Sequence, residues 1–253
     1  MATDITMPKA DAPPNGDFPV LPDPSELIDS DGEPMDTEWH RRAMMVLLDS
    51  VEYHLKGRED YYVGGNMFLY FSLARARNRD FRGPDFFFVN GVSRRPMRRY
   101  WAVWDENGRY PDVIIELLSQ STATEDLTTK KDIYEQTFRT PEYFCYDPDG
   151  QVLKGWRLES RLYRPIPPEP DGRLHSEVLD LWIGPWLGEV SGYEEVWLRF
   201  FDREGRLVPT GAGELHLQRV EAEKQRADQA EAELARLRLA LEEARRSGAG
   251  NET

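Results

Sequence analysis

The alternation of apolar and polar residues predicts one helix and several short strands in the first half of the chain. Apolar residues recur at helical spacing from Trp39 to Leu55, with Asp36 as the predicted N-cap and Gly57 after the last turn. Beyond it the chain becomes aromatic and β-prone, with breaks at glycine and proline. Strands are predicted over 61–71, with an interruption at 64–65, and over 86–89, 100–104 and 112–119.

The second half begins with a polar run that opens another helix. Thr122 and Glu125 have the spacing of a capping box, which predicts a helix over 123–138. A strand over 143–146, the turn 147–150 and a strand over 152–158 then form a predicted hairpin. The order helix, strands, helix, strands indicates an α/β or α+β domain with a mixed sheet.

Composition divides the chain into four parts. Residues 1–38 hold ten Asp or Glu against Lys9, so 1–35 are predicted to be a disordered acidic leader. The folded domain is expected over 36–212, in which residues 160–212 are β-rich and close the domain. A helical or coiled-coil tail is expected over 213–247, and a disordered end over 248–253.

The tail carries a weak heptad pattern. Small or polar residues, among them Glu223 and Ala227, occupy several of the predicted core positions. The pattern predicts a homodimer through this helix, with a solvated single helix as the alternative.

Charge and cysteine content restrict the class of protein. The formal net charge is −14, 40% of the residues are hydrophobic, and Cys145 is the single cysteine. An internal disulfide and a cysteine-based zinc site are therefore excluded. The sequence shows no apolar run of membrane-spanning length and no secretory signal, which indicates a cytoplasmic protein with no membrane partner.

An arginine-rich segment departs from this acidic background. Residues 75–99 hold eight arginines against Asp80 and Asp85. Such a density can contact phosphates, so nucleic acid is the expected partner, with Arg94, Arg95, Arg98 and Arg99 as the binding residues. The alternative is a solvated charged loop, or a set of ion-pair partners for the acidic leader.

Glu116 is the candidate for chemistry, because it stands within the apolar strand 112–119. Burying an ionised carboxylate without a partner costs several kcal/mol or more, so a cation, a strong donor or a metal is expected beside it. A core glutamate paired with an arginine is the structural alternative.

Geometry selects a second carboxylate for this site. Asp112 lies four residues from Glu116 on the same strand, about 13 Å away, too far to share a metal. Asp85 opens the strand 86–89 and is the better candidate, with its carboxylate expected within about 6 Å of Glu116. Two carboxylates with waters form the oxygen-rich site that Mg²⁺ or Mn²⁺ prefers. The four histidines show no zinc-binding spacing and are interpreted as ordinary surface or core residues.

Lys130 and Lys131 are the candidates for the cation of the site. Lys130 shares a helix face with Asp126 and Tyr134, so its amine is expected near Glu116, although an ordinary ion pair with Asp126 is the simpler reading. Lys131 points about 100° away and is expected to pair with Glu135 and reach solvent.

Together these motifs resemble the Uma-two family of restriction-endonuclease-like proteins, of the PD-(D/E)XK superfamily. The resemblance is carried by the blocks Pro84-Asp85, Pro111-Asp112-xxx-Glu116-xx-Ser119, Asp126-xxx-Lys130-xxx-Tyr134, and Pro141-Glu142-Tyr143 with Asp147-Pro148. It extends over roughly residues 36–205, and the block from Pro111 to Pro148 is its specific part.

The resemblance implies a restriction-endonuclease-like mixed central sheet flanked by helices, with a metal-dependent phosphodiesterase site. Asp85 and Glu116 match the metal-binding acids, and Lys130 in the following helix takes the place of the motif lysine, where this chain has Leu118. Asp112, Lys131 and Ser119 are secondary candidates. The function indicated is a metal-dependent DNA endonuclease.

Two other functions compete with this one. The first is a catalytically degenerate nuclease fold that binds nucleic acid or protein, which Leu118 favours. The second is a coiled-coil adaptor whose folded domain is only structural. Metal binding by the folded domain separates the endonuclease from both.

Overall fold

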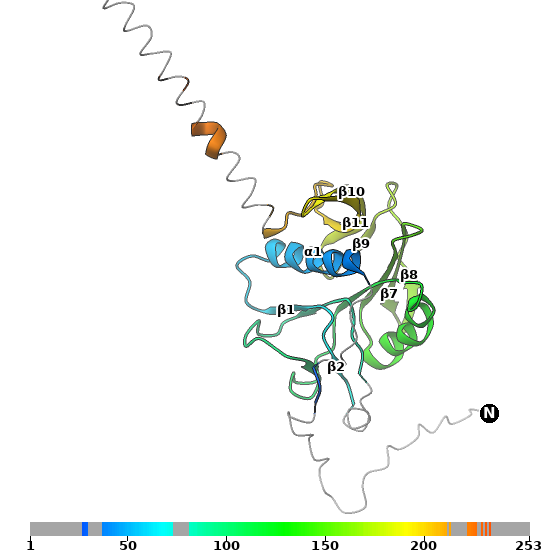
Figure 1. Cartoon of the computed structure of the whole chain (residues 1–253). Helices are drawn as coiled ribbons and strands as arrows, with labels where there is room; N and C mark the ends of the chain where they lie inside the picture. Colours follow the sequence, from blue (N-terminus) through cyan, green and yellow to red (C-terminus); the bar gives the residue numbers. More distant parts are fainter. Residues whose placement is uncertain are drawn as a thin grey trace, which may run out of the picture.

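The computed structural model describes residues 27–29, 37–72, 81–211, 213, 222–226, 229, 231 and 233. The fold is mixed α/β (Figure 1). Its main helices are α1 (Glu38–His54) and a second, composite helix over 123–138. The composite helix, here called the site helix, is made of α3 (Ala123–Glu125), η2 (Asp126–Lys130), α4 (Lys131–Ile133) and η3 (Tyr134–Phe138).

A six-stranded sheet forms the centre, in the order β1-β3-β5-β6-β7-β8. The β5–β6 pair is parallel and every other pair in this sheet is antiparallel, which makes the sheet mixed. Its strands are β1 (Tyr61–Gly64), β3 (Phe86–Asn90), β5 (Val113–Leu117), β6 (Glu142–Asp147), β7 (Val152–Glu159) and β8 (Leu162–Pro165).

Two smaller sheets complete the domain. One is antiparallel, in the order β11-β10-β9, and the other is the parallel pair β2-β4. Their strands are β2 (Leu69–Tyr70), β4 (Trp101–Ala102), β9 (Leu174–Ser176), β10 (Leu181–Val190) and β11 (Tyr193–Phe201).

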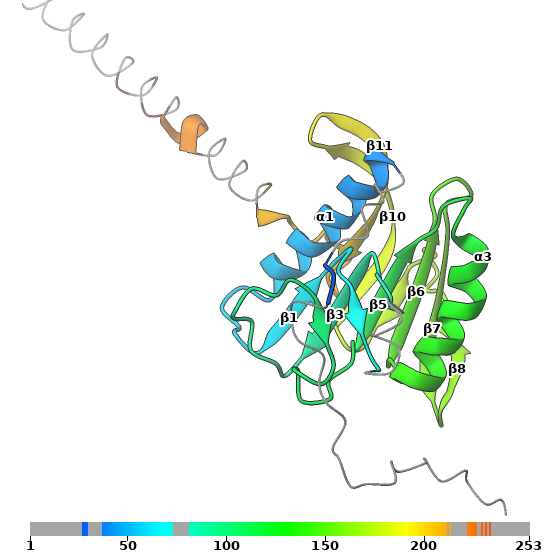
Figure 2. The ribbon, with the colours of Figure 1, turned by 60° about the horizontal axis from the view of Figure 1, so that its bottom comes forward.

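The central sheet is covered on both faces, which explains why β5 is apolar throughout. Helix α1 and the β10–β11 sheet lie over one face, and the site helix lies over the other (Figure 2). Successive side chains of a strand point to opposite faces. Val113, Ile115 and Leu117 therefore pack under α1, whereas Ile114 packs toward the site helix.

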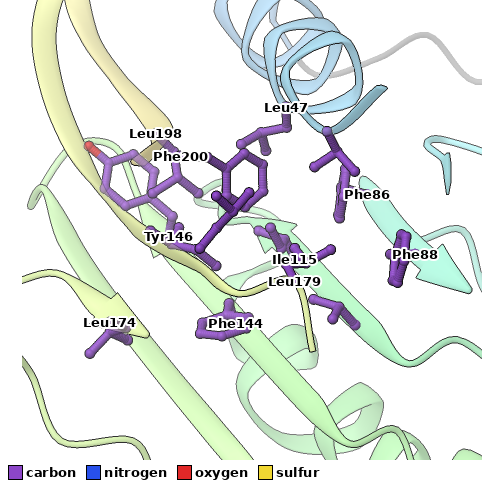
Figure 3. Packing of buried hydrophobic residues seen from close by; sticks show 14 of the residues in the cluster. Leu47, Phe86, Phe88, Ile115, Phe144, Tyr146, Leu174, Leu179, Leu198 and Phe200 are labelled. Atoms are coloured by element: carbon purple, nitrogen blue, oxygen red, sulfur yellow. The ribbon is translucent and has the colours of Figure 1, made fainter. Parts of the chain in front are cut away.

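The core under α1 joins distant parts of the chain. Leu47 of α1 packs over Phe86 of β3 and Ile115 of β5, with Phe200 of β11 beside them (Figure 3). The residues predicted to be only a β-rich closure of the domain thus supply one wall of its main core.

The predicted caps of both helices are wrong, although the second helix begins at residue 123 as predicted. The N-cap of α1 is Thr37, whose side chain accepts a hydrogen bond from the backbone N–H of His40, rather than Asp36. The predicted capping box is not formed, because Thr122 has helical backbone angles and its hydroxyl lies 3.1 Å from that of Ser119. The preceding loop uses the hydroxyl that the box would need.

The predicted leader and tail lie mostly outside the described residues. Residues 27–29, however, pack onto the domain: Leu27 is buried and the backbone carbonyl of Ile28 accepts a hydrogen bond from the Tyr70 hydroxyl. The expectation of a leader unattached up to residue 35 is therefore wrong at this point. In the tail, residues 222–226 are helical and exposed. Among the described helices, none has the length and apolar character to cross a bilayer.

Leu47 tests the packing of α1 on the sheet. Its side chain is fully buried, so Leu47→Ala should lower the free energy of unfolding by about 2–5 kcal/mol through lost burial and a residual cavity. Met45 lies on the exposed side of the same helix, 54% accessible, and Met45→Ala should change that free energy by less than about 0.5 kcal/mol. Urea unfolding of both variants measures the difference, and equal effects would contradict this packing.

Candidate active site

Asp85 and Glu116 are placed together by the register of β3 and β5. Phe86 pairs with Ile115 in this antiparallel ladder, so the next position sets Asp85 opposite Glu116. Both residues also fall on the face that Phe87 and Ile114 share, the face covered by the site helix. The two carboxylates thus lie on one side of the sheet, at the end of β3 where its chain enters.

Hydrogen bonds to the backbone fix the two carboxylates. The backbone N–H of Leu117 donates to Asp85 Oδ2 (2.7 Å), and the backbone N–H of Asp85 faces Glu116 Oε2 (3.4 Å). Each carboxylate is therefore held by the strand that carries the other. The arrangement leaves Glu116 almost inaccessible, at 1%, while the Asp85 side chain keeps 17% of its surface exposed.

The site helix supplies the compensating donors. Lys130 Nζ lies 3.2 Å from Glu116 Oε1 and 2.6 Å from Asp126 Oδ1, and the Tyr134 hydroxyl donates to the same Glu116 oxygen (2.9 Å). The amine of Lys130 is therefore where the helical spacing predicts it. It bridges two buried carboxylates, which goes beyond the simple surface pair with Asp126.

The site helix contains two π-helical segments, where a regular α-helix was predicted. In an α-helix four residues advance about 400°, so side chains spaced by four drift around the axis. A π turn, bonded from i to i+5, rotates less per residue and offsets this drift. Asp126, Lys130 and Tyr134 fall in or beside the π segments Asp126–Lys130 and Tyr134–Phe138, and this geometry keeps them in line over Glu116.

Burial and like charge together raise the pKa of Glu116 to about 8. Burial is the largest cause, Lys130 opposes it, and the carboxylates of Asp85 and Asp126 add to it. Burial also raises the pKa of Asp126, again against Lys130. For Lys130 burial would lower the pKa, but the carboxylates of Glu116 and Asp126 more than offset it and the pKa rises. The cluster holds more acid than its one lysine neutralises.

His40 is a site residue that the sequence reasoning missed. It lies on the first turns of α1, is buried, and its Nε2 is 3.0 Å from Asp85 Oδ1. A signal was present, because His40 belongs to the apolar stripe of the helix, with Ala43 and Leu47 one and two turns further on. The search for a zinc-type pair of histidines overlooked a single histidine on a buried face.

The secondary candidates lie apart from the carboxylates. Asp112 accepts hydrogen bonds from the backbone N–H of Asn90 (2.7 Å) and from Arg109 (3.2 Å), at the other end of β3. Ser119 has its hydroxyl 2.8 Å from that of Ser121, in the loop that follows β5. Asp112 thus fixes strand ends, and Ser119 belongs to the rim of the site.

The predicted ion pair between Lys131 and Glu135 is wrong, and Lys131 is partly exposed. Its amine lies over the ring of Trp156, 4.9 Å from the centroid, and over that of Tyr163 at 5.8 Å. Glu135, its expected partner, instead accepts a hydrogen bond from the backbone N–H of Tyr163. The aromatic rings of β7 and β8 retain Lys131 on the sheet.

The arginines predicted to bind DNA lie beyond the far end of β3, which spans about 17 Å from the Asp85 end. Arg94 pairs with Glu52 (2.9 Å), Arg99 pairs with Asp29 (2.7 Å), and Arg98 pairs with Glu106. Arg95 makes no ion pair with any residue of the described part. The alternative hypothesis for this segment was that its arginines form ion pairs with the acidic leader. The Arg99–Asp29 pair is of that kind, because Asp29 belongs to the predicted leader.

The donor set is compatible with a divalent cation. Across the described ranges, no group of three or more His, Cys, Asp or Glu has a metal-binding arrangement. Mg²⁺, however, is commonly held by one or two carboxylates and completes its shell with water. Asp85 and Glu116 supply that number, and a positive ion beside them would relieve the repulsion that raises the pKa of Glu116.

Comparisons with known proteins address the family. No curated protein matches the chain. Among solved structures, one titled "putative nuclease", from Anabaena variabilis ATCC 29413, is similar with a TM-score of 0.43 and 15% identity, over 58% of this chain and 76% of that one.

A family model supplies the assignment. The model described as "Uma2: Putative restriction endonuclease" matches residues 25–187, well over half of the chain. The mixed sheet with helices on both faces is the restriction-endonuclease-like fold that the sequence predicts. The chain belongs to the Uma2 family of restriction-endonuclease-like proteins.

Proposed function

We propose that this protein is an endonuclease that hydrolyses phosphodiester bonds of DNA with Mg²⁺ or Mn²⁺ as cofactor. The observation that carries the proposal is the buried cluster of Asp85, Glu116 and Lys130, which combines two carboxylates with a fixed cation. Maintaining a carboxylate at 1% accessibility costs folding free energy, which chemistry explains better than packing does.

Asp85 and Glu116 are the proposed ligands of the divalent ion. When bound, the ion polarises the phosphate and lowers the pKa of the attacking water. Asp85 is oriented by the backbone N–H of Leu117 and by His40, and Glu116 by Tyr134, so neither carboxylate has to reorganise.

Lys130 is the residue proposed to orient the attacking water or to stabilise the negative charge that develops on the phosphate. Its amine is held between Glu116 and Asp126, and its raised pKa keeps it protonated at neutral pH. The Lys130 side chain keeps 15% of its surface exposed, whereas the Glu116 side chain keeps 1%, so Lys130 is the more accessible of the two. Leu118, at the usual position of the motif lysine, is buried in the core beneath the site helix.

Metal binding should depend on pH through Glu116. Because the pKa of Glu116 is about 8, the carboxyl is protonated below that value and must lose its proton to bind the ion. The affinity for Mn²⁺ should therefore rise by up to about tenfold per pH unit from pH 6 and level off near pH 8. Isothermal titration calorimetry in buffers of different ionisation enthalpy measures both the affinity and the proton release.

Matched variants define which carboxylates take part. Glu116→Gln and Asp85→Asn should lose Mn²⁺ binding, whereas Asp112→Asn should keep it, because Asp112 lies at the other end of β3. Binding that is unchanged in Glu116→Gln, or that is independent of pH between 6 and 8, would refute the proposed ligand set.

The two adjacent lysines test the catalytic role of Lys130. Lys130→Ala should lower the rate of nicking of supercoiled plasmid with Mn²⁺ by about 100-fold or more, since it removes the cation beside Glu116. Lys131→Ala should stay within about threefold, because that amine lies over Trp156. Rates are followed by gel electrophoresis, with Glu116→Gln as the inactive reference.

The fold of the variants is checked in the same experiment. Removing Lys130 leaves buried acids without their cation, so circular dichroism and thermal unfolding accompany each rate, and Lys130→Gln replaces the alanine variant if that one does not fold. Equal losses from Lys130 and Lys131, or full activity without Lys130, would assign the role elsewhere. Binding of DNA without any nicking would favour the degenerate, binding-only function.

A further inference from the structure

A hollow of about 720 Å³ opens beside the carboxylate cluster. It lies between the start of α1, the loop after β5, the turn between β6 and β7, and β11. Its volume is within the range of sites that bind small molecules. His40 connects the two features, because it lines the hollow and also contacts Asp85.

The lining excludes phosphate and favours a neutral polar ring. The residues that line the hollow include two carboxylates, Asp149 and Glu195, and no lysine or arginine from the described part of the chain. A phosphate would be repelled by these acids. Gln120, Gln151 and the hydroxyl of Thr37 offer both donors and acceptors, which suits a group with several hydrogen-bonding atoms on its edge.

The apolar side of the hollow is rigid. Trp39 stacks on Trp197 with the rings 3° from parallel and their centroids 5.9 Å apart. Its indole N–H donates to the backbone carbonyl of Val196 (3.3 Å), and Leu118 forms the adjoining wall. Trp39 also stacks on Tyr146, with centroids 6.2 Å apart, so its position is fixed by two rings. The apolar atoms of Leu118, Pro148 and Val196 complete this side, and an apolar side next to polar groups is suited to a nucleobase.

Residues that line the hollow lie close to Glu116 in the sequence. Leu118 and Ser119 line it and follow Glu116 by only two and three residues. A group in the hollow is thus next to any phosphate that lies on Asp85 and Glu116. A paired base reaches it only after extrusion from the duplex, which costs a few kcal/mol, whereas an unpaired base avoids that cost.

We propose that the hollow binds an unpaired nucleobase next to the phosphate that is cleaved, so that the substrate is single-stranded or locally unpaired DNA. This inference rests on the proposed nuclease function. Bases with an exocyclic amino group, such as cytosine and adenine, fit best, because Asp149 and Glu195 can only accept hydrogen bonds when ionised.

Binding without metal tests the inference separately from cleavage. Fluorescence anisotropy with a labelled 12-nucleotide single strand and its duplex should show at least tenfold tighter binding of the single strand. Ser121→Trp, which fills the hollow, should remove this difference, while Thr137→Trp, on the exposed side of the site helix, should keep it. Equal affinity of the full-length chain for both forms, or an unaffected Ser121→Trp, would overturn the inference.

The same assay tests which base the hollow prefers, and whether that base belongs to a DNA strand or to a free nucleoside. Oligo(dC) should bind at least fivefold tighter than oligo(dT), and the double variant Asp149→Asn, Glu195→Gln should bring this ratio close to one. Removing two negative charges should strengthen the binding of both oligonucleotides alike, and this common effect cancels in the ratio of their affinities. Free deoxycytidine should compete only at far higher concentration; competition as strong as that of the oligonucleotide would assign the hollow to a free nucleoside and overturn the substrate class.

The outcomes distinguish this inference from the nuclease proposal. Selective binding of single strands without cleavage in Mn²⁺ would refute the nuclease and keep the hollow as a base-binding site. Cleavage of plasmid with no preference for unpaired DNA would keep the nuclease and refute the role of the hollow.

Discussion

The buried carboxylate of Glu116 is the constraint to which the surrounding structure responds. It stands in the centre strand of a sheet that is covered on both faces, where an unpaired charge would be destabilising by several kcal/mol. Lys130, Tyr134 and the backbone N–H of Asp85 converge on it from the helix and from the next strand. Two of these donors, Lys130 and Tyr134, lie in the two π segments of the site helix.

Acidic residues gather around Glu116, whereas the arginines lie at the other end of β3. The acids Asp85, Glu116 and Asp126 gather about one lysine, and the neighbouring hollow adds Asp149 and Glu195. The arginines of β3's far end are engaged with Glu52, Glu106 and Asp29. Phosphate contacts by these arginines would compete with their ion pairs to Glu52, Glu106 and Asp29.

The sequence predicted those parts of the site that lie on one element or in one strand register. Glu116 was recognisable as a polar residue in an apolar strand, and the spacing of Lys130 from Asp126 and Tyr134 indicated the inner face of the helix. The mixed α/β class and five strands of the central sheet followed from periodicity and turn residues, whereas β8 was covered only by the general expectation of a β-rich segment. The apolar stripe of α1 indicated that His40 is buried, but not that it contacts Asp85, because α1 reaches Asp85 only through tertiary packing.

Other partners could not be predicted from local patterns for the same reason. The spacing on the helix predicted Glu135 as the partner of Lys131, but the rings of Trp156 and Tyr163, from two later strands, lie beside its amine. Arg94 and Arg99 pair with Glu52 and Asp29, which are distant in sequence, while their contact with DNA stays a prediction. In each case the deciding partner is supplied by a contact between elements far apart along the chain.

The location of a bound metal ion tests the central claim most directly. Crystals soaked in Mn²⁺ and measured at the manganese absorption edge should show an anomalous peak in contact with the carboxylates of Asp85 and Glu116, with Lys130 beside it. Soaked crystals of Glu116→Gln should lack that peak. A peak at another group of residues, or none at the Asp85–Glu116 pair at saturating Mn²⁺, would contradict the account of this cluster as a metal-dependent active site.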